Sequence, residues 1–97
     1  MTFRRKARVD KNQPELVKYF RDNGFDVLHL HQLKNCADLC ISYQGVTALV
    51  EVKQSKKDKL TTGENNFMQN WSGLYYICTS KDDADTIMME IKKRSIL

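Results

Sequence analysis

Two runs of strand-forming residues on either side of Gln44-Gly45 constrain the fold of this chain more than any other feature. Residues 37–43 and 46–53 are rich in β-branched and large apolar side chains, which is typical of strands. A glycine-containing dipeptide between two such runs favours a tight turn. The segment is therefore predicted to be a β-hairpin in which Tyr43 pairs with Val46.

This pairing fixes the register of the hairpin. Because paired residue numbers have a constant sum in an antiparallel pair, Asp38 is expected directly opposite Glu51. Alternate residues share a face, so Lys53 is expected beside Glu51. The opposite face is apolar throughout and is expected to pack on the core; it consists of Ala37, Leu39, Ile41, Tyr43, Val46, Ala48, Val50 and Val52.

The rest of the chain is predicted to add three helices and two strands, in the order α-β-β-β-α-β-α. Asn12 is the expected N-cap of the first helix, with Glu15 three residues later as its capping-box partner. A strand over 25–31 follows. Thr61 and Glu64 predict a second capping box. The mostly apolar run 74–79 is expected to be a central strand, and a last helix begins after Ser80.

Length and composition set the class of protein. Ninety-seven residues support one domain, predicted over residues 12–97 after a basic, flexible N-terminus of residues 1–11. No apolar run reaches the roughly 20 residues of a membrane helix, and the basic start lacks the apolar stretch of a secretory signal. We therefore expect an intracellular, cytoplasmic protein without a membrane partner. Its three cysteines are expected to be reduced and structural.

The positive charge is clustered. A formal net charge of +4 favours a polyanionic partner. The clusters expected to contact DNA phosphates are Lys56, Lys57 and Lys59 after the hairpin, and Arg4, Arg5 and Lys6 at the N-terminus.

Asp38, Glu51 and Lys53 are the candidate chemical groups. Two carboxylates facing each other across a strand pair repel, unless a cation lies between them. Carboxylate oxygens suit Mg²⁺ or Mn²⁺. Lys53 would then orient or deprotonate a water and neutralise charge on a scissile phosphate. The alternative is a solvated face on which Lys53 is a simple salt-bridge partner. The apolar surroundings of Asp38 favour the metal.

These residues also resemble a known motif. Ala37-Asp38, twelve intervening residues and then Glu51-Val52-Lys53 are similar to the PD-(D/E)XK nuclease motif, with Ala37 in place of the usual proline. From about Asn12 to Asp85 the chain resembles the VRR-NUC and phage Holliday-junction-resolvase-like branch of that superfamily. The resemblance implies an α/β (α+β) fold with a restriction-endonuclease-like αβββαβ(α) core, in which helices flank a mixed central sheet.

The resemblance also assigns roles to residues. Asp38, Glu51 and the main-chain carbonyl of Val52 would bind the metal, and Lys53 would be the catalytic lysine. Glu15 would match the first-helix acid that reaches the metal directly or through water, although a purely capping role stays open. Glu64 is interpreted as a helix cap rather than a ligand.

The expected function is that of a Mg²⁺- or Mn²⁺-dependent endonuclease in a bacterium or phage-infected cell. Its expected substrate is branched DNA such as a Holliday junction. Two cuts in a branched substrate and a small core both favour a homodimer. Two alternatives remain. One is a non-catalytic DNA-binding or interaction module of the same fold, and the other is a nuclease that acts on linear or duplex DNA without junction preference.

Overall fold

The computed structural model describes residues 10–30 and 32–95, and its elements follow the predicted order. They are α1 (Gln13–Asp22), β1 (Asp26–His29), β2 (Leu39–Tyr43), β3 (Val46–Val52), α2 (Thr62–Asn70), β4 (Leu74–Cys78) and α3 (Lys81–Ser95). Within these ranges no helix has the length and apolar character needed to span a membrane. The predicted contact residues Arg4, Arg5 and Lys6 lie outside the described residues.

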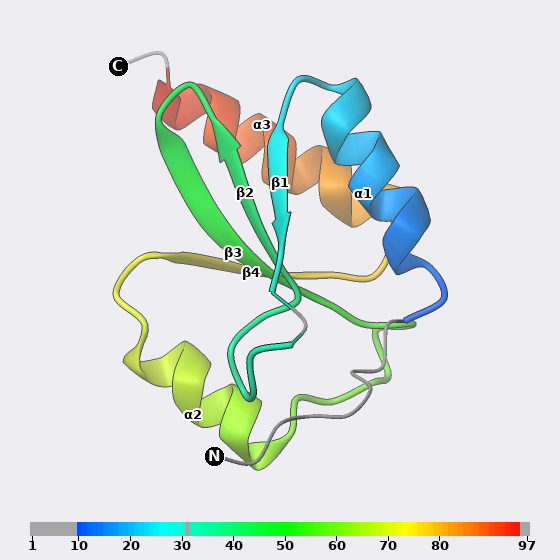
Figure 1. Cartoon of the computed structure of the whole chain (residues 1–97), viewed down its shortest axis with the longest axis vertical. Helices are drawn as coiled ribbons and strands as arrows, with labels where there is room; N and C mark the ends of the chain where they lie inside the picture. Colours follow the sequence, from blue (N-terminus) through cyan, green and yellow to red (C-terminus); the bar gives the residue numbers. More distant parts are fainter. Residues whose placement is uncertain (1–9, 31, 96–97) are drawn as a thin grey trace.

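The predicted hairpin is confirmed. β2 and β3 pair antiparallel from Tyr43–Val46 to Leu39–Val50. Gln44 and Gly45 both have positive φ angles, 46° and 86°, as a two-residue type I′ turn requires. β1 joins β2 antiparallel and β4 joins β3 parallel, so the sheet is mixed and has the order β1-β2-β3-β4 (Figure 1).

β4 is an edge strand, and the prediction of a central position is wrong. Its apolar composition has another cause, because both of its faces are partly covered. Cys78 is fully buried under the helical layer, and the ring of Tyr75 contacts that of Phe67 in α2 at a centroid distance of 6.2 Å. Ile77 remains 42% exposed. Apolar composition alone does not separate such an edge strand from a central one.

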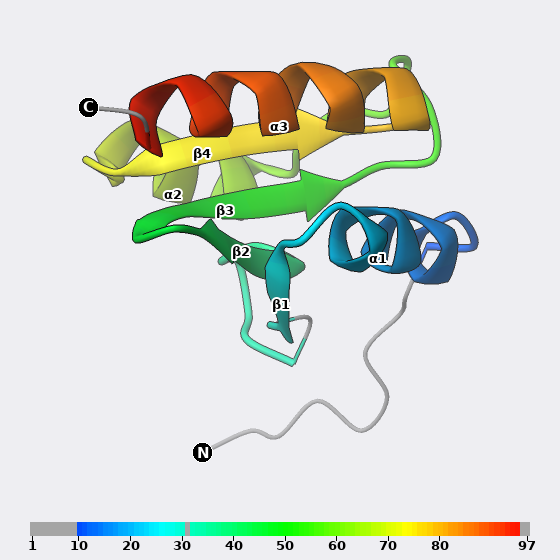
Figure 2. The same ribbon diagram turned by 90° about the horizontal axis from the view of Figure 1, so that it is seen from above.

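α1 and α3 cover one face of the sheet, as Figure 2 shows for α3 over β3 and β4. Alternate residues of the strands point into this layer and form the core with the apolar stripes of the helices. The core face of the hairpin is confirmed: Ala37, Leu39, Ile41, Ala48, Val50 and Val52 are buried, with Tyr43 and Val46 partly buried beside them. The opposite face carries Cys40, Ser42, Thr47 and a buried Leu49 along the strands, and the charged side chains lie at its end away from the turn.

α2 belongs to that opposite face. Its capping box forms as predicted, since Thr61 Oγ1 accepts from Glu64 N and the Glu64 carboxylate accepts from Thr61 N. None of the α2 residues is buried. The helix therefore does not contribute to the main core, and Glu64 in its first turn contacts Lys53, the residue after β3.

Asn12 does not cap α1 with its side chain, contrary to the prediction. Its Nδ2 instead donates to the carbonyl oxygens of Lys53, at 3.0 Å, and Thr79, at 3.1 Å. These carbonyls follow β3 and β4, so Asn12 ties the start of α1 to the ends of the two parallel strands. This contact places residues just before α1 beside the charged end of β3.

Candidate active site

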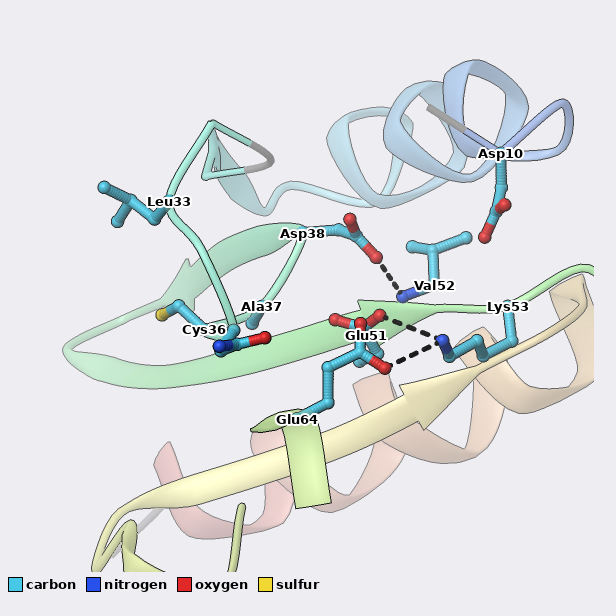
Figure 3. A pocket seen from close by; sticks show the side chains of 10 residues that line it. Asp10, Leu33, Cys36, Ala37, Asp38, Glu51, Val52, Lys53 and Glu64 are labelled. Atoms are coloured by element: carbon cyan, nitrogen blue, oxygen red, sulfur yellow. Dashed lines mark hydrogen bonds and ion pairs between the residues drawn. The ribbon is translucent and has the colours of Figure 1, made fainter. Parts of the chain in front are cut away.

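A cavity of about 170 Å³ lies at the end of the hairpin away from its turn (Figure 3). It contains the three predicted residues Asp38, Glu51 and Lys53. Its full lining is Asp10, Leu33, Asn35, Cys36, Ala37, Asp38, Glu51, Val52, Lys53 and Glu64. The structure thus brings the predicted charges together and adds two carboxylates, those of Asp10 and Glu64, that were not predicted as part of the site.

Asp38 lies one residue beyond the last regular pair of the hairpin. The expected pair with Glu51 is not formed, because the N–H of Asp38 donates to the carbonyl of Val50 at 3.1 Å. Its Oδ2 accepts from the N–H of Val52 at 2.8 Å. The side chain therefore occupies a position that a backbone carbonyl would take in a continued ladder, and its carboxylate is held at the cavity (Figure 3).

The carboxyl groups of Asp38 and Glu51 are both destabilised in their charged forms. Burial raises the pKa of Asp38. The hydrogen bond from the Val52 amide lowers it, whereas the charges of Asp10 and Glu64 raise it further. Burial raises the pKa of Glu51 to about 8, with further contributions from Asp38 and Glu64. Glu51 is only 4% exposed. A cation bound between the two carboxylates would relieve this cost.

Lys53 lies between two carboxylates. Its Nζ is 3.0 Å from Glu64 Oε1 and 3.5 Å from Glu51 Oε2. Burial on its own would lower the pKa of Lys53, but the hydrogen bond and charge of Glu64, followed by Glu51, raise it. The side chain therefore remains an ammonium at neutral pH. Glu64 is the capping residue that was predicted, and it is also part of the charged cluster.

Glu15 does not join this cluster. Its side chain is 65% exposed, and its Oε1 lies 3.3 Å from Lys81 Nζ. The capping role expected for it is not formed either. The Asn12 contact explains the difference, because it fixes α1 so that Asp10, before the helix, faces the cavity, while Glu15 faces the start of α3. Asp10 carried no sequence signal, since it stands alone in a basic segment.

The three lysines after β3 that were predicted to contact DNA differ in their contacts. Lys57 and Lys59 are exposed. Lys56 is exposed as well, but its Nζ pairs with Asp83 Oδ1 at 2.8 Å. All three cysteines are free, as expected; Cys78 is buried and Cys36 lines the cavity.

The donor set at the cavity fits Mg²⁺ better than a metal that needs a complete protein cage. Within residues 10–30 and 32–95, no three His, Cys, Asp or Glu side chains are arranged to hold a metal ion together. Mg²⁺ is commonly bound through one or two carboxylates, with waters and substrate phosphates as its remaining ligands. Asp38 and Glu51 supply that pair, and burial, followed by the charges of Asp38 and Glu64, raises the pKa of Glu51.

Comparison of the chain with protein-family models, with curated proteins and with solved structures finds no match. The site is therefore assigned from its own geometry and chemistry.

Proposed function

We propose that this chain is a Mg²⁺- or Mn²⁺-dependent endonuclease of the PD-(D/E)XK type that hydrolyses phosphodiester bonds in DNA. One observation carries the proposal. Two carboxylates that repel each other, Asp38 and Glu51, share a cavity with the ammonium group of Lys53. Proteins tolerate such costly arrangements mainly at functional sites.

Asp38 and Glu51 would hold the cation, and Asp10 would supply the additional acid that the resemblance assigned to Glu15. Asp10 lines the same cavity, and its charge raises the pKa of Asp38, so a cation there would interact favourably with all three carboxylates. The chemistry that such a cation supplies when bound is Lewis-acid activation of a water and of the scissile phosphate.

Lys53 would act as a positively charged hydrogen-bond donor rather than as a base. Its pKa is raised by Glu64 and Glu51 despite burial, so Nζ keeps its proton at neutral pH. An ammonium that faces the cavity donates hydrogen bonds to phosphate oxygens and stabilises the negative charge that develops there during hydrolysis. The alternative expectation, that Lys53 deprotonates a water, does not fit this charge state, because a protonated amine cannot accept a second proton.

The substrate would be selected by shape rather than by base sequence. α1 and α3 are both used to cover the sheet, and α2 begins at the cavity itself. The exposed Lys57 and Lys59 lie in the loop between β3 and α2, where they would contact the phosphate backbone. Branched DNA is the proposed substrate because the resemblance to resolvase-like nucleases implies it.

Cleavage separates this proposal from a non-catalytic binding module, because both predict salt-sensitive DNA binding. The purified chain is incubated with a four-way junction, a flap, linear duplex and circular DNA, in Mg²⁺, Mn²⁺ or chelator. We expect metal-dependent cuts, fastest in the junction, that are lost in Lys53→Met. Lys18→Met is the matched control, since Lys18 is exposed and pairs with Asp22 on α1. Binding without any metal-dependent cleavage would support the binding module instead.

A further inference from the structure

Glu64 connects two parts of the molecule that have few other contacts. A single oxygen, Glu64 Oε1, accepts from Lys53 Nζ at 3.0 Å and from the backbone N–H of Thr61 at 2.9 Å. The first contact is to the end of β3, and the second closes the capping box of α2. These two hydrogen bonds link the start of α2, in which no residue is buried, to the end of β3.

Lys53 needs an anchor of this kind. The lysine side chain is a flexible four-carbon stem with a compact charge, so its position depends on the partners of its ammonium group. Glu64 is the nearer partner, at 3.0 Å against 3.5 Å for Glu51. If the Glu51 carboxylate turned to a cation, Glu64 would be the acid that still holds Nζ at the cavity.

The first turn of α2 is also close to the loop before β2. A Cβ added at Gly63 would lie 2.5 Å from Asn35 Cγ, which is closer than real side chains approach. Asn35 lines the same cavity. The first turn of α2 therefore lies against this loop on one side and contacts Lys53 through Glu64.

We propose that Glu64 is a positioning residue for Lys53: its carboxylate holds the ammonium group at the cavity wall and couples the start of α2 to the site. The catalytic consequence rests on the proposed nuclease function. The contact itself does not, and it can be measured without metal or substrate.

The first measurement is a double-mutant cycle by urea unfolding in the presence of chelator. Glu64→Gln keeps an oxygen that accepts from the Thr61 amide but removes the negative charge that pairs with Lys53. We expect the effect of the double variant on the unfolding equilibrium constant to differ by about three- to tenfold from the product of the effects of Lys53→Met and Glu64→Gln. Thr61→Val, which weakens the cap alone, should have the same effect in both Lys53 backgrounds. Strict additivity of Glu64→Gln and Lys53→Met would overturn the proposal.

The second measurement uses steady-state cleavage. Glu64→Gln should lower kcat about tenfold and leave KM within about twofold, because a displaced lysine affects the transition state more than substrate binding. Thr61→Val should leave both constants near those of the unmodified chain. An unchanged kcat in Glu64→Gln, or an equal loss in Thr61→Val, would refute positioning by the charge. If the unmodified chain cleaves nothing, the nuclease proposal fails, and the metal-free coupling still decides whether Glu64 holds Lys53.

Discussion

Replacement of Glu51 by glutamine should stabilise the metal-free protein, and the gain should increase with pH. Glu51 is buried beside Asp38 and Glu64, and these surroundings disfavour its charged form. Glutamine has nearly the same shape but carries no charge. The substitution therefore removes an electrostatic cost while it leaves the packing of β3 in place.

The size of the gain follows from the proton balance. The pKa of Glu51 rises from an ordinary 4.5 to about 8 in the folded protein. Between these values the folded state holds a proton that the unfolded chain has lost, so stability falls by about 1.4 kcal/mol for each pH unit. Below this window the effect is absent, and above it the loss is complete. From pH 5 to pH 9, Glu51→Gln should therefore gain about 2–4 kcal/mol relative to the unmodified chain.

Urea unfolding at a series of pH values in chelator measures this difference. Asp26→Asn is the matched control, because Asp26 is an exposed strand carboxylate away from the cavity. The control should follow the unmodified chain at every pH. When Mn²⁺ replaces the chelator, the unmodified chain should become more stable than Glu51→Gln. A stability difference for Glu51→Gln that stays constant from pH 5 to pH 9 would show that the carboxylate is not under electrostatic strain.

Three other substitutions test separate parts of the account. Asp10→Asn should weaken Mn²⁺ binding about tenfold in calorimetry, whereas Glu15→Gln should leave it within about twofold; equal effects would remove Asp10 from the site. Gly63→Ala should change the free energy of unfolding by less than about 1 kcal/mol, because the exposed Asn35 side chain can turn away and alanine favours a helix; a loss of about 2 kcal/mol or more would show that Asn35 is held against α2. Leu39→Ala should cost about 2–5 kcal/mol, because Leu39 is fully buried between the sheet and the helices; a loss below about 1 kcal/mol would contradict this packing.

The hairpin could be predicted because its determinants are local. The unbroken apolar pattern at alternate positions defined the core face, which left Asp38, Glu51 and Lys53 on the other face, and Gln44-Gly45 set the register from within the turn. The grouping of Glu51 with Lys53 followed from their spacing alone. The capping box of Thr61 and Glu64 was predictable for the same reason, since all of its hydrogen bonds lie within four consecutive residues.

The features that sequence did not predict depend on contacts between distant segments. Asn12 has the pattern of a helix cap, but its amide bonds to carbonyl groups 41 and 67 residues away. Those contacts turn Glu15 toward Lys81 and bring Asp10 to the cavity. The position of a strand within a sheet is similarly non-local, and apolar composition gave the wrong place for β4.

The central claim is that Asp38 and Glu51 bind one divalent cation between them. Anomalous diffraction from crystals soaked in Mn²⁺ tests it most directly. We expect a single strong peak at the cavity, with an oxygen of each carboxylate about 2.1 Å from the ion and Lys53 Nζ still held by Glu64. Well-ordered carboxylates that point apart, with no anomalous peak near either one, would contradict the claim.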